Sequence, residues 1–429
     1  MKPLLKRIIV SIITLEARLL LKRTQPQIVA ITGSVGKTSV KDATYAVLKD
    51  HLHARKSEKS YNSEIGVPLS VLGLRNGWNN PLKWLKNIVD GALFVLHPVE
   101  YPKLLVLEVG VDRPGDMEKL TRWIHPDVVV LTRLPSVPVH VEYFGSPEDV
   151  IREKRKLVDA LKPEGILVYN QDDEKVTSIA KGTRNQSIAY SRYSRSHFTA
   201  SADTVVYENG KAVGSEFTLT HMEKTTTVRV NGSLGVQHAY NYAAAIAVGS
   251  IFGVSVDDAA VSLRAHLPPP GRMRLLSGIK ETMILDDTYN SSPVAAERSL
   301  QTLKEMKGVN RRIAVLGDMM ELGRYSVREH ERIGEFVAEC VDLLITVGVR
   351  SRGIARGALD HGMSEKHILQ YDDATRAGKE LEALMQEGDV ILIKGSQSVR
   401  LEKVVEEIMA EPERAGELLV RQSKVWKSL

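Results

Sequence analysis

The sequence predicts an α/β protein built on a doubly wound sheet. Short apolar runs rich in β-branched residues alternate with helical patterns in both halves of the chain. A stretch that alternates polar and apolar residues, followed by a proline-rich segment, separates the two series. At 429 residues the chain is too long for one ordinary domain, so we expect two or three.

The composition narrows the function classes. Hydrophobic residues make up 43% of the chain and charged residues 26%, which is typical of a globular protein. A single cysteine, Cys340, excludes a disulfide framework and a cysteine-ligated metal cluster, and it fits a reducing cytoplasm. The net charge of +5 is mild and no long Lys/Arg block occurs, so we expect no nucleic-acid partner; a small anion such as a nucleotide fits this charge.

Residues 1–25 predict a basic amphipathic helix. The uncharged run from Ile8 to Leu15 is too short to span a bilayer, and no small-residue cleavage site follows, so neither a membrane span nor secretion is expected. Two readings stay open for this helix. It packs on the domain that follows, or it lies on an anionic membrane surface.

The first α/β series begins after Pro26. Residues 27–33, QIVAITG, read as a buried parallel strand, and a helix follows from Lys37. Further strands of this series are expected at residues 103–110, 127–134 and 165–170. Residues 75–102 hold two of the four tryptophans and an apolar helical face, which we read as either core or a docking surface.

The middle of the chain changes character. Residues 197–232 alternate polar and apolar residues around Asn209–Gly210, which predicts antiparallel hairpins. An Ala-rich buried helix is expected at 235–253, and LPPPGR at 267–272 reads as a linker. Strands of a second, Rossmann-like α/β unit are expected within residues 282–290, 311–319, 342–348 and 389–396. The expected division is an N-terminal helix (1–25), a P-loop-containing central domain (26–270) and a C-terminal domain (271–429).

The segment ITGSVGKTSVKD, residues 31–42, resembles a phosphate-binding loop. The first glycine of the full pattern is replaced by Ile31, but a glycine loop still joins a strand to a helix. Backbone N–H groups of such a loop face phosphate, its lysine reaches the terminal phosphates, and its hydroxyl binds Mg²⁺. The residues expected to bind nucleotide are Gly33, Ser34, Val35, Gly36, Lys37, Thr38 and Ser39.

Three further residues carry weaker signals. Glu108 ends a predicted strand at the sheet edge that faces the nucleotide, so it is a candidate Mg²⁺ ligand. Taken alone, His140 reads more readily as a surface residue, and Lys154 as one charge on a solvated helix face. Their interpretation depends on the motifs around them.

Read together, the motifs resemble those of the Mur ligase family. After the glycine loop come YNSEIGVPLS, LEVGVDRPGD, HVEYFGS, NQDDE, PPPGRM, LDDTYNSSP, VLGDMMELG and IKGSQSVRLEKVV, over residues 26 to about 410. The last four favour the family branch that adds D-alanyl-D-alanine.

The resemblance implies roles at the matching positions. It implies ATP and two Mg²⁺ ions, the first on Thr38 and Glu108, the second on His140 and a carbamylated Lys154. Arg272 would meet the γ-phosphate, and Asp287 and Asn290 would hold ribose and adenine. Lys37, His140, Lys154 and Arg272 would be catalytic. Substrate contacts are expected at Asn62, Lys394, Ser396 and Arg400.

The resemblance also implies a reaction: a carboxylate attacks ATP to give an acyl phosphate, and an amine then displaces phosphate to form an amide. The expected substrates are a muramoyl-peptide acid and D-Ala-D-Ala or a similar amine, in cell-wall precursor synthesis. Two alternatives stay open: a ligase of the folylpolyglutamate or cyanophycin type, and a non-catalytic ATP-binding scaffold.

The sequence departs from the family pattern at four places. Only one helix precedes the glycine loop, where the family carries a domain that grips a UDP-sugar. Gln237 and His238 replace a His-Asn pair, Arg133 replaces an asparagine, and residues 75–102 are an insertion. These departures motivate the hypothesis of a lipid-linked acyl substrate, with residues 1–25 and 75–102 in peripheral contact with the inner face of the membrane. The alternative is that a partner chain or the insertion supplies the lost grip.

Overall fold

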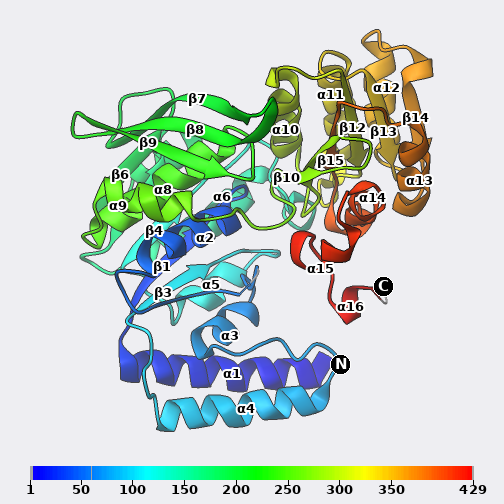
Figure 1. The fold of residues 1–429 in the computed structure, drawn as a ribbon. Coiled ribbons are helices and arrows are strands. Elements are labelled where there is room, and N and C mark those ends of the chain that lie inside the picture. Colours follow the sequence, from blue (N-terminus) through cyan, green and yellow to red (C-terminus); the bar gives the residue numbers. More distant parts are fainter. Residues whose placement is uncertain (1–2, 59, 428–429) are drawn as a thin grey trace.

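Two sheets organise the chain in the computed structural model, which describes residues 3–58 and 60–427 (Figure 1). The first sheet has nine strands in the order β2-β3-β1-β4-β5-β6-β7-β8-β9. Pairing is parallel from β2 to β7 and antiparallel from β7 to β9. The bounds are β1 Gln27–Thr32, β2 Ala54–Lys56, β3 Leu104–Glu108, β4 Val128–Leu131, β5 Ile166–Asn170, β6 Gln186–Ser191, β7 Phe198–Glu208, β8 Lys211–His221 and β9 Lys224–Asn231.

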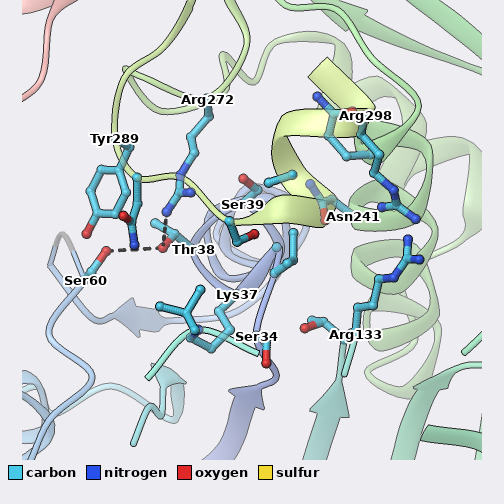
Figure 2. Close-up of a pocket in the computed structure, with 18 of the residues that line it drawn as sticks. Ser34, Lys37, Thr38, Ser39, Ser60, Arg133, Asn241, Arg272, Tyr289 and Arg298 are labelled. Atoms are coloured by element: carbon cyan, nitrogen blue, oxygen red, sulfur yellow. Dashed lines mark hydrogen bonds between the residues drawn. The ribbon is translucent and has the colours of Figure 1, made fainter. Parts of the chain in front are cut away.

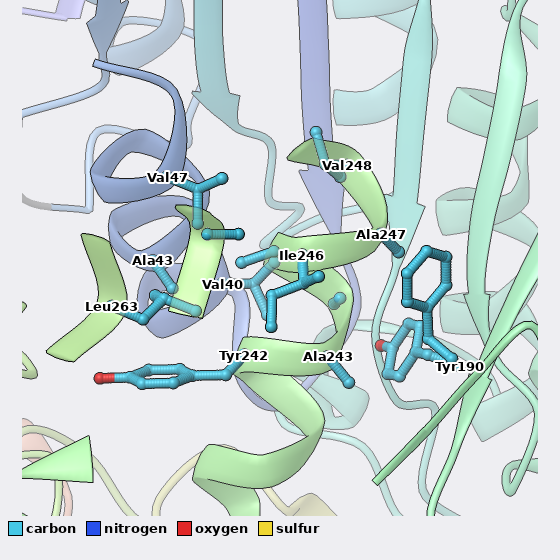
Figure 3. Close-up of a cluster of buried hydrophobic side chains, with 14 of the residues drawn as sticks. Val40, Ala43, Val47, Tyr190, Tyr242, Ala243, Ile246, Ala247, Val248 and Leu263 are labelled. Atoms are coloured by element: carbon cyan, nitrogen blue, oxygen red, sulfur yellow. The ribbon is translucent and has the colours of Figure 1, made fainter. Parts of the chain in front are cut away.

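Helices cover both faces of this sheet, because successive residues of each buried strand point to opposite sides. On β1, Val29 and Ile31 join one apolar cluster, whereas Ile28 and Ala30 join the other. The first cluster packs against α2, α8 and α9, with Ile246 of α8 beside Val40 of α2 (Figure 3) and Gly249 of α8 close to Val47 of α2. The second packs against the other six helices of this part. The bounds are α1 Pro3–Thr24, α2 Lys37–Leu48, α3 Gly66–Leu72, α4 Pro81–Leu96, α5 Asp116–Thr121, α6 Pro147–Asp159, α7 Glu174–Lys181, α8 Gln237–Ile251 and α9 Val256–Arg264.

The predicted hairpins extend the parallel sheet. Strands β7 and β8 are joined by the two residues Asn209 and Gly210, both with positive φ (50° and 78°), and Glu208 pairs with Lys211. A two-residue turn of this kind matches the natural twist of antiparallel strands. The Asn-Gly pair therefore sets the hairpin register, as the sequence predicted.

The second sheet has six strands in the order β10-β11-β15-β12-β13-β14, all parallel except β10. Together with the first sheet it confirms the predicted α/β class. The strand bounds are β10 Arg274–Ser277, β11 Met283–Asp287, β12 Arg311–Gly317, β13 Leu343–Val347, β14 Ile368–Tyr371 and β15 Asp389–Lys394. The helix bounds are α10 Pro293–Glu305, α11 Ser326–Ala338, α12 Arg352–Asp360, α13 Ala374–Leu384, α14 Glu402–Ile408, α15 Ala415–Leu418 and α16 Lys424–Lys427.

Helices α1 and α4 lie side by side below α3 (Figure 1). They run in the same direction: Arg23, at the end of α1, donates to the carbonyl of Val95, at the end of α4, at 2.8 Å. Glu16 of α1 is buried against Gly91 of α4, and its Oε2 has no hydrogen-bond partner. The first predicted reading of the N-terminal helix, packing on the domain that follows, is therefore confirmed. Within the described residues no helix has the length and apolarity needed to cross a bilayer.

The C-terminal segment returns to the first half of the molecule. Trp426 of α16 makes a T-shaped contact with Trp78, in the loop before α4, with ring centroids 6.3 Å apart. The guanidinium of Arg400 lies over the Trp426 ring, 5.5 Å from its centroid. These contacts attach α16 to the loop before α4 and to the segment that follows β15.

Candidate functional site

A cavity of about 320 Å³ lies where the two halves of the molecule meet, at the N-terminus of α2 (Figure 2). It contains most of the predicted site residues, drawn from segments as far apart as the glycine loop and β15. Gly33, Ser396 and Arg400 are not among its lining residues. The predicted residues that do line it are Ser34, Val35, Gly36, Lys37, Thr38, Ser39, Asn62, Glu108, His140, Lys154, Arg272, Asp287, Asn290 and Lys394.

The glycine loop requires both of its glycines. Gly33 has φ 138°, and a Cβ there would lie 2.0 Å from Oγ1 of Thr132. Gly36 has φ 90°, and a Cβ there would lie 2.8 Å from Oδ1 of Asn241. Ile31, at the place of the absent glycine, is fully buried within β1. The loop therefore turns only after Thr32, and a side chain at position 31 fills the core instead of obstructing the loop.

Two lysines meet at one carbonyl. Nζ of Lys37 and Nζ of Lys154 donate to the carbonyl oxygen of Gly33 at 3.0 and 3.1 Å. No carboxylate within the described residues forms an ion pair with either. Burial is the largest cause that lowers the pKa of both ammonium groups, that of Lys154 well below its usual range. Arg272 lowers the pKa of Lys37 further and Lys37 lowers that of Lys154, whereas Glu108 raises the pKa of Lys37 and Asp112 raises both. In the part of the chain that the structure describes, neither amino group has a carboxylate in direct contact, and a polyphosphate would place anionic oxygens there.

Oxygen ligands suited to Mg²⁺ lie beside this pair. Glu108, 1% exposed, accepts from Nδ2 of Asn62 through Oε1 (3.0 Å), while its buried Oε2 has no partner. Oγ1 of Thr38 lies 3.2 Å from Oγ of Ser60. Among the described residues no three His, Cys, Asp or Glu side chains form a ready-made metal cluster. Mg²⁺ takes one or two protein oxygens and completes its shell with phosphate and water, so these residues fit the ion.

His140 reaches across to the C-terminal half. Its Nδ1 lies 2.7 Å from Oε2 of Glu321, and its Nε2 lies 3.6 Å from Oδ1 of Asp112. The backbone N–H of Glu142 also donates to the carbonyl of Glu321. The close approach of His140 lowers the pKa of Glu321. His140 thus lines the cavity with Lys154 and at the same time contacts the opposite half of the molecule.

Arg272 follows the linker and projects into the cavity. Its guanidinium stacks on the ring of Tyr289, 4.0 Å from the centroid, and its Nη2 donates to Oγ1 of Thr38 at 3.3 Å (Figure 2). Its Nε is buried and has no hydrogen-bond partner. The linker arginine is therefore held at the glycine loop by a ring contact and retains donor capacity for an anion.

Asp287 and Lys394 form a buried ion pair at the C-terminal side. Nζ of Lys394 lies 2.7 Å from Oδ2 of Asp287 and donates to the carbonyl of Asn290 at 2.9 Å. Oγ of Ser299 also donates to the same carboxylate oxygen. This network fixes the loop after β11 that carries Tyr289 and Asn290 toward the cavity.

Ser396 and Arg400 have other partners. Oγ of Ser396 accepts from the N–H of Met320 at 2.8 Å, so it supports the loop after β12. Nε of Arg400 donates to Glu402, and its guanidinium lies over Trp426. These contacts organise the segment after β15 behind the cavity wall and do not bring either side chain to the cavity.

Sequence reasoning missed several lining residues. Arg133 and Arg298 approach each other on the side of the cavity opposite Arg272 and Tyr289 (Figure 2). Arg133 was noted only as a departure from the family pattern, and Arg298 looks like an ordinary helix charge. The other lining residues that sequence reasoning missed include Ser60, Asn241 and Tyr289. Tyr289 lies within the motif LDDTYNSSP, so that motif was the available signal.

Of the two residues that replace the family's His-Asn pair, His238 has a hydrogen-bond partner that accounts for its position. Nε2 of His238 lies 2.7 Å from Oγ of Ser233, which donates to the carbonyl of Met273 beside Arg272. Burial lowers the pKa of His238 to about 4, so the ring is neutral near pH 7. Gln237 and His238 both line the cavity, and the buried Oε1 of Gln237 has no hydrogen-bond partner.

Comparisons with known proteins agree with this arrangement. The family described as Mur ligase middle domain matches residues 31–249, and the family described as Mur ligase, glutamate ligase domain, matches residues 271–397. The UDP-N-acetylmuramoyl-tripeptide–D-alanyl-D-alanine ligase (MurF) of Bacillus subtilis is 28% identical over 92% of this chain and 79% of its own. The enzyme of that name from Mycobacterium leprae is 31% identical over 87% and 72%.

A solved structure extends the likeness to the fold. The crystal structure of MurF ligase from Thermotoga maritima in complex with ADP covers 95% of this chain and 84% of its own, with 26% identity and a TM-score of 0.76. Both family matches, the relatives and this structure span the two sheets and the cavity between them. The chain belongs to the Mur ligase family.

Proposed function

We propose that the protein is an ATP-dependent amide ligase that works through an acyl phosphate. The observation that carries this proposal is the pair of buried lysines, Lys37 and Lys154, that share one carbonyl at a glycine loop and have no carboxylate partner. The neighbouring Glu108 has a buried, unpartnered oxygen. Together they fit a bound polyphosphate with Mg²⁺. ADP in the Thermotoga MurF structure supports the nucleotide part of this proposal.

The residues of the cavity account for the chemistry by position and charge. The loop amides and Lys37 would hold the phosphates, and Arg272 would meet the γ-phosphate as a substrate carboxylate oxygen attacks it and ADP leaves. Mg²⁺ on Thr38 and Glu108 would neutralise phosphate charge. The amine nitrogen then attacks the acyl carbon, phosphate leaves, and the amide forms. No nucleophilic side chain is needed, because positioning and charge neutralisation lower the barrier.

Lys154 is proposed as a carbamate that holds a second Mg²⁺ together with His140. Only a neutral amine adds CO₂, and burial lowers the pKa of Lys154 well below its ordinary value. The side chain of Lys154 is 1% exposed, so it is not one of the charges on the solvent-facing side of its helix. A carbamate would replace a buried amine with anionic oxygens, which are the ligands Mg²⁺ prefers.

The substrates follow from the relatives. Their names describe a D-alanyl-D-alanine ligase acting on a UDP-N-acetylmuramoyl-tripeptide. We propose a muramoyl-peptide acid and D-Ala-D-Ala, or a similar amine, as the substrates here. Asn62 would lie near the acyl group, since it lines the cavity and donates to Glu108. Asp287 and Asn290 would contact ribose and adenine from the C-terminal side.

The proposed division of the chain is an N-terminal helix (1–25), a central ATP-binding domain (26–270) and a C-terminal domain (271–429). We further propose that the protein acts in the cytoplasm and contacts the membrane peripherally through residues 1–25 and 75–102. The cavity lies between the second and third of these units, so their closure would shield the acyl phosphate from water.

Phosphate release with a panel of amines tests the function. The purified protein, ATP and Mg²⁺ are incubated with a muramoyl-tripeptide acid and with D-Ala-D-Ala, D-Ala, L-Glu or no amine. We expect phosphate release and amide product with D-Ala-D-Ala. Product with glutamate instead would point to a folylpolyglutamate-type reaction, and binding of ATP with no product under any condition would point to a scaffold.

A further inference from the structure

Exposed apolar side chains concentrate on one part of the surface. Of the 22 large hydrophobic residues that are exposed in the described chain, 12 lie between residues 5 and 99. Ten of them stand on two neighbouring helices, and we call nine of these, all except Phe94, the α1–α4 apolar face. Its members are Leu5, Ile8, Leu15 and Leu19 on α1, and Leu82, Leu85, Val89, Leu93 and Leu96 on α4.

Helix α1 has two apolar stripes where packing alone requires one. Ile9, Ile13, Ala17 and Leu20 are buried against the domain. The exposed members recur at spacings of three, four and seven residues, so they form a second stripe along the same helix. A helix that serves only to cover a core would carry polar residues there.

Helix α4 places its two faces on opposite sides. Gly91 lies against Glu16 of α1 and Trp84 is 2% exposed, whereas Leu82 and Leu85 are 75% and 60% exposed. The exposed members again follow a spacing of three and four residues. Helices α1 and α4 run side by side in the same direction at one edge of the molecule (Figure 1), and each carries an exposed apolar stripe along its length.

Basic side chains accompany this face. The two helices carry seven lysines and arginines, all exposed: Lys6, Arg7, Arg18, Lys22, Arg23, Lys83 and Lys86. Of their two carboxylates, that of Glu16 is buried, and Asp90 pairs with Lys86 at 2.6 Å. The accessible charge is therefore strongly positive around an apolar centre. This combination is typical of helices that lie in the headgroup region of an anionic bilayer.

We propose that the α1–α4 apolar face docks on an anionic lipid bilayer, with both helices lying in the plane of the interface and their leucines entering the acyl boundary. The proposal deepens the membrane contact put forward above as part of the proposed function. Charge complementarity favours a bilayer over a second copy of the chain. In a dimer formed through this face, the identical basic residues of the two copies would be brought together and would repel each other.

The docking surface is connected to the substrate side of the cavity. Helix α3 packs on α1, and the loop directly before α3 carries Ser60 and Asn62, which line the cavity. Docking would therefore place the proposed acyl-substrate loop near the bilayer. From this connection we take a lipid-linked carboxylic acid as the substrate class.

Vesicle flotation tests the docking surface. The full chain is mixed with vesicles of phosphatidylcholine alone or of phosphatidylcholine with phosphatidylglycerol, and the bound fraction is measured at low and high salt. We expect binding to the anionic vesicles that salt weakens. The triple variant L85S/V89S/L93S should bind about a hundredfold more weakly, because three apolar side chains leave the acyl boundary.

A matched control uses exposed valines elsewhere. V261S/V327S/V349S removes side chains that are 68–71% exposed in other parts of the molecule, and its vesicle binding should equal that of the unchanged protein. Thermal unfolding checks that both variants fold. Absence of binding by the unchanged protein, or a stable dimer that L85S/V89S/L93S dissociates, would overturn the proposal. Phosphate release with a soluble muramoyl-peptide acid is measured in parallel, so that loss of ligase function is distinguished from loss of docking.

Discussion

At the scale of single residues, the site depends on cations held close together before any ligand binds. Lys37 and Lys154 share the carbonyl of Gly33, and Arg272 donates to Thr38 close by. Holding these charges in a buried cavity costs free energy, which a bound polyphosphate would return. The cavity is therefore arranged for an anionic ligand at the expense of its own stability.

Replacing Lys37 should lower activity without lowering the stability of the unliganded protein. In Lys37→Ala we expect phosphate release to fall by about 10²–10³-fold, because a cation at the transferring phosphoryl group is lost. Thermal stability without nucleotide should be unchanged or higher, since the free-energy cost of burying the Lys37 amino group is gone. Activity assays and calorimetric unfolding measure the two effects. Lys211→Ala, at an exposed position, is the control; equal loss in both variants would contradict the role of Lys37.

A variant at Lys154 can distinguish the loss of the second metal site from the loss of nucleotide binding. Lys154→Ala should lower turnover by about 10²-fold or more while ATP affinity changes little, because the glycine loop is intact. Turnover of the unchanged protein should also fall in buffer freed of CO₂ and recover with bicarbonate. Lys156→Ala, on the same helix with a partly exposed side chain, serves as control. Bicarbonate independence would refute the carbamate.

Gly36 offers a test of the loop itself. In Gly36→Ala the new Cβ would meet Oδ1 of Asn241 at 2.8 Å, at φ 90°. We expect nucleotide affinity to fall at least tenfold, measured by calorimetric titration with ADP. Gly115→Ala has the same backbone cost, φ 87°, with nothing within 4 Å of its Cβ, and should bind ADP normally. Loss of binding in both variants would mean that backbone strain alone is responsible.

At the scale of elements, the contact between α1 and α4 contains a buried carboxyl. Burial raises the pKa of Glu16 to about 7, from an ordinary value of 4.5. A raised pKa means that the folded state binds the proton more tightly than the unfolded chain does. The stabilisation from protonated Glu16 is therefore complete below about pH 4.5 and is lost as the pH rises through about 7.

Glu16→Gln should accordingly stabilise the protein most above pH 7, by up to about 2 kcal/mol, because an amide carries no charge to desolvate. The advantage should shrink toward pH 5. Chemical unfolding at several pH values measures the difference, with Glu387→Gln, at an exposed site, as reference. A pH-independent difference between Glu16→Gln and the unchanged protein would show that Glu16 is not protonated by burial.

The sequence predicted long, strongly apolar elements and overlooked short ones. Strands β1 and β15 were recognisable as buried β-branched runs, whereas β2 has three residues and β14, ILQY, lies at a sheet edge with mixed polarity. A half-exposed edge strand carries neither the apolar run nor a clear alternation. The hairpins were predicted, but their attachment to the parallel sheet through pairing of β6 with β7 was not.

The site was predictable where a motif names the residue. Lys37 and Thr38 follow from the glycine loop, and Lys154 was found only through the family resemblance, because its burial comes from tertiary packing that no local pattern records. Glu321 and Arg298 come from the C-terminal half and reach the site only after folding. Sequence periodicity does not reveal site residues that come from a different half of the molecule.

At the scale of the whole molecule, the contact of His140 with Glu321 joins the two halves beside the cavity. Glu321→Ala should weaken the closed arrangement, lower kcat about tenfold and leave ADP affinity within a few-fold of the original. Solution scattering should show a larger radius of gyration with nucleotide bound. Glu339→Ala, which removes an ion pair with Lys304 inside the C-terminal half, is the control. A normal kcat in Glu321→Ala would show that closure does not depend on this contact.

The edge-to-face packing of Trp78 and Trp426 gives the molecule a built-in optical reporter. Indole transitions couple strongly only when the rings are close and fixed in orientation, and here one ring belongs to the last helix and the other to the loop that leads into α4. Near-ultraviolet circular dichroism would therefore register any swing of the C-terminal half away from the N-terminal helices, without a label and during turnover. Trp426→Phe would silence that signal and serve as its blank.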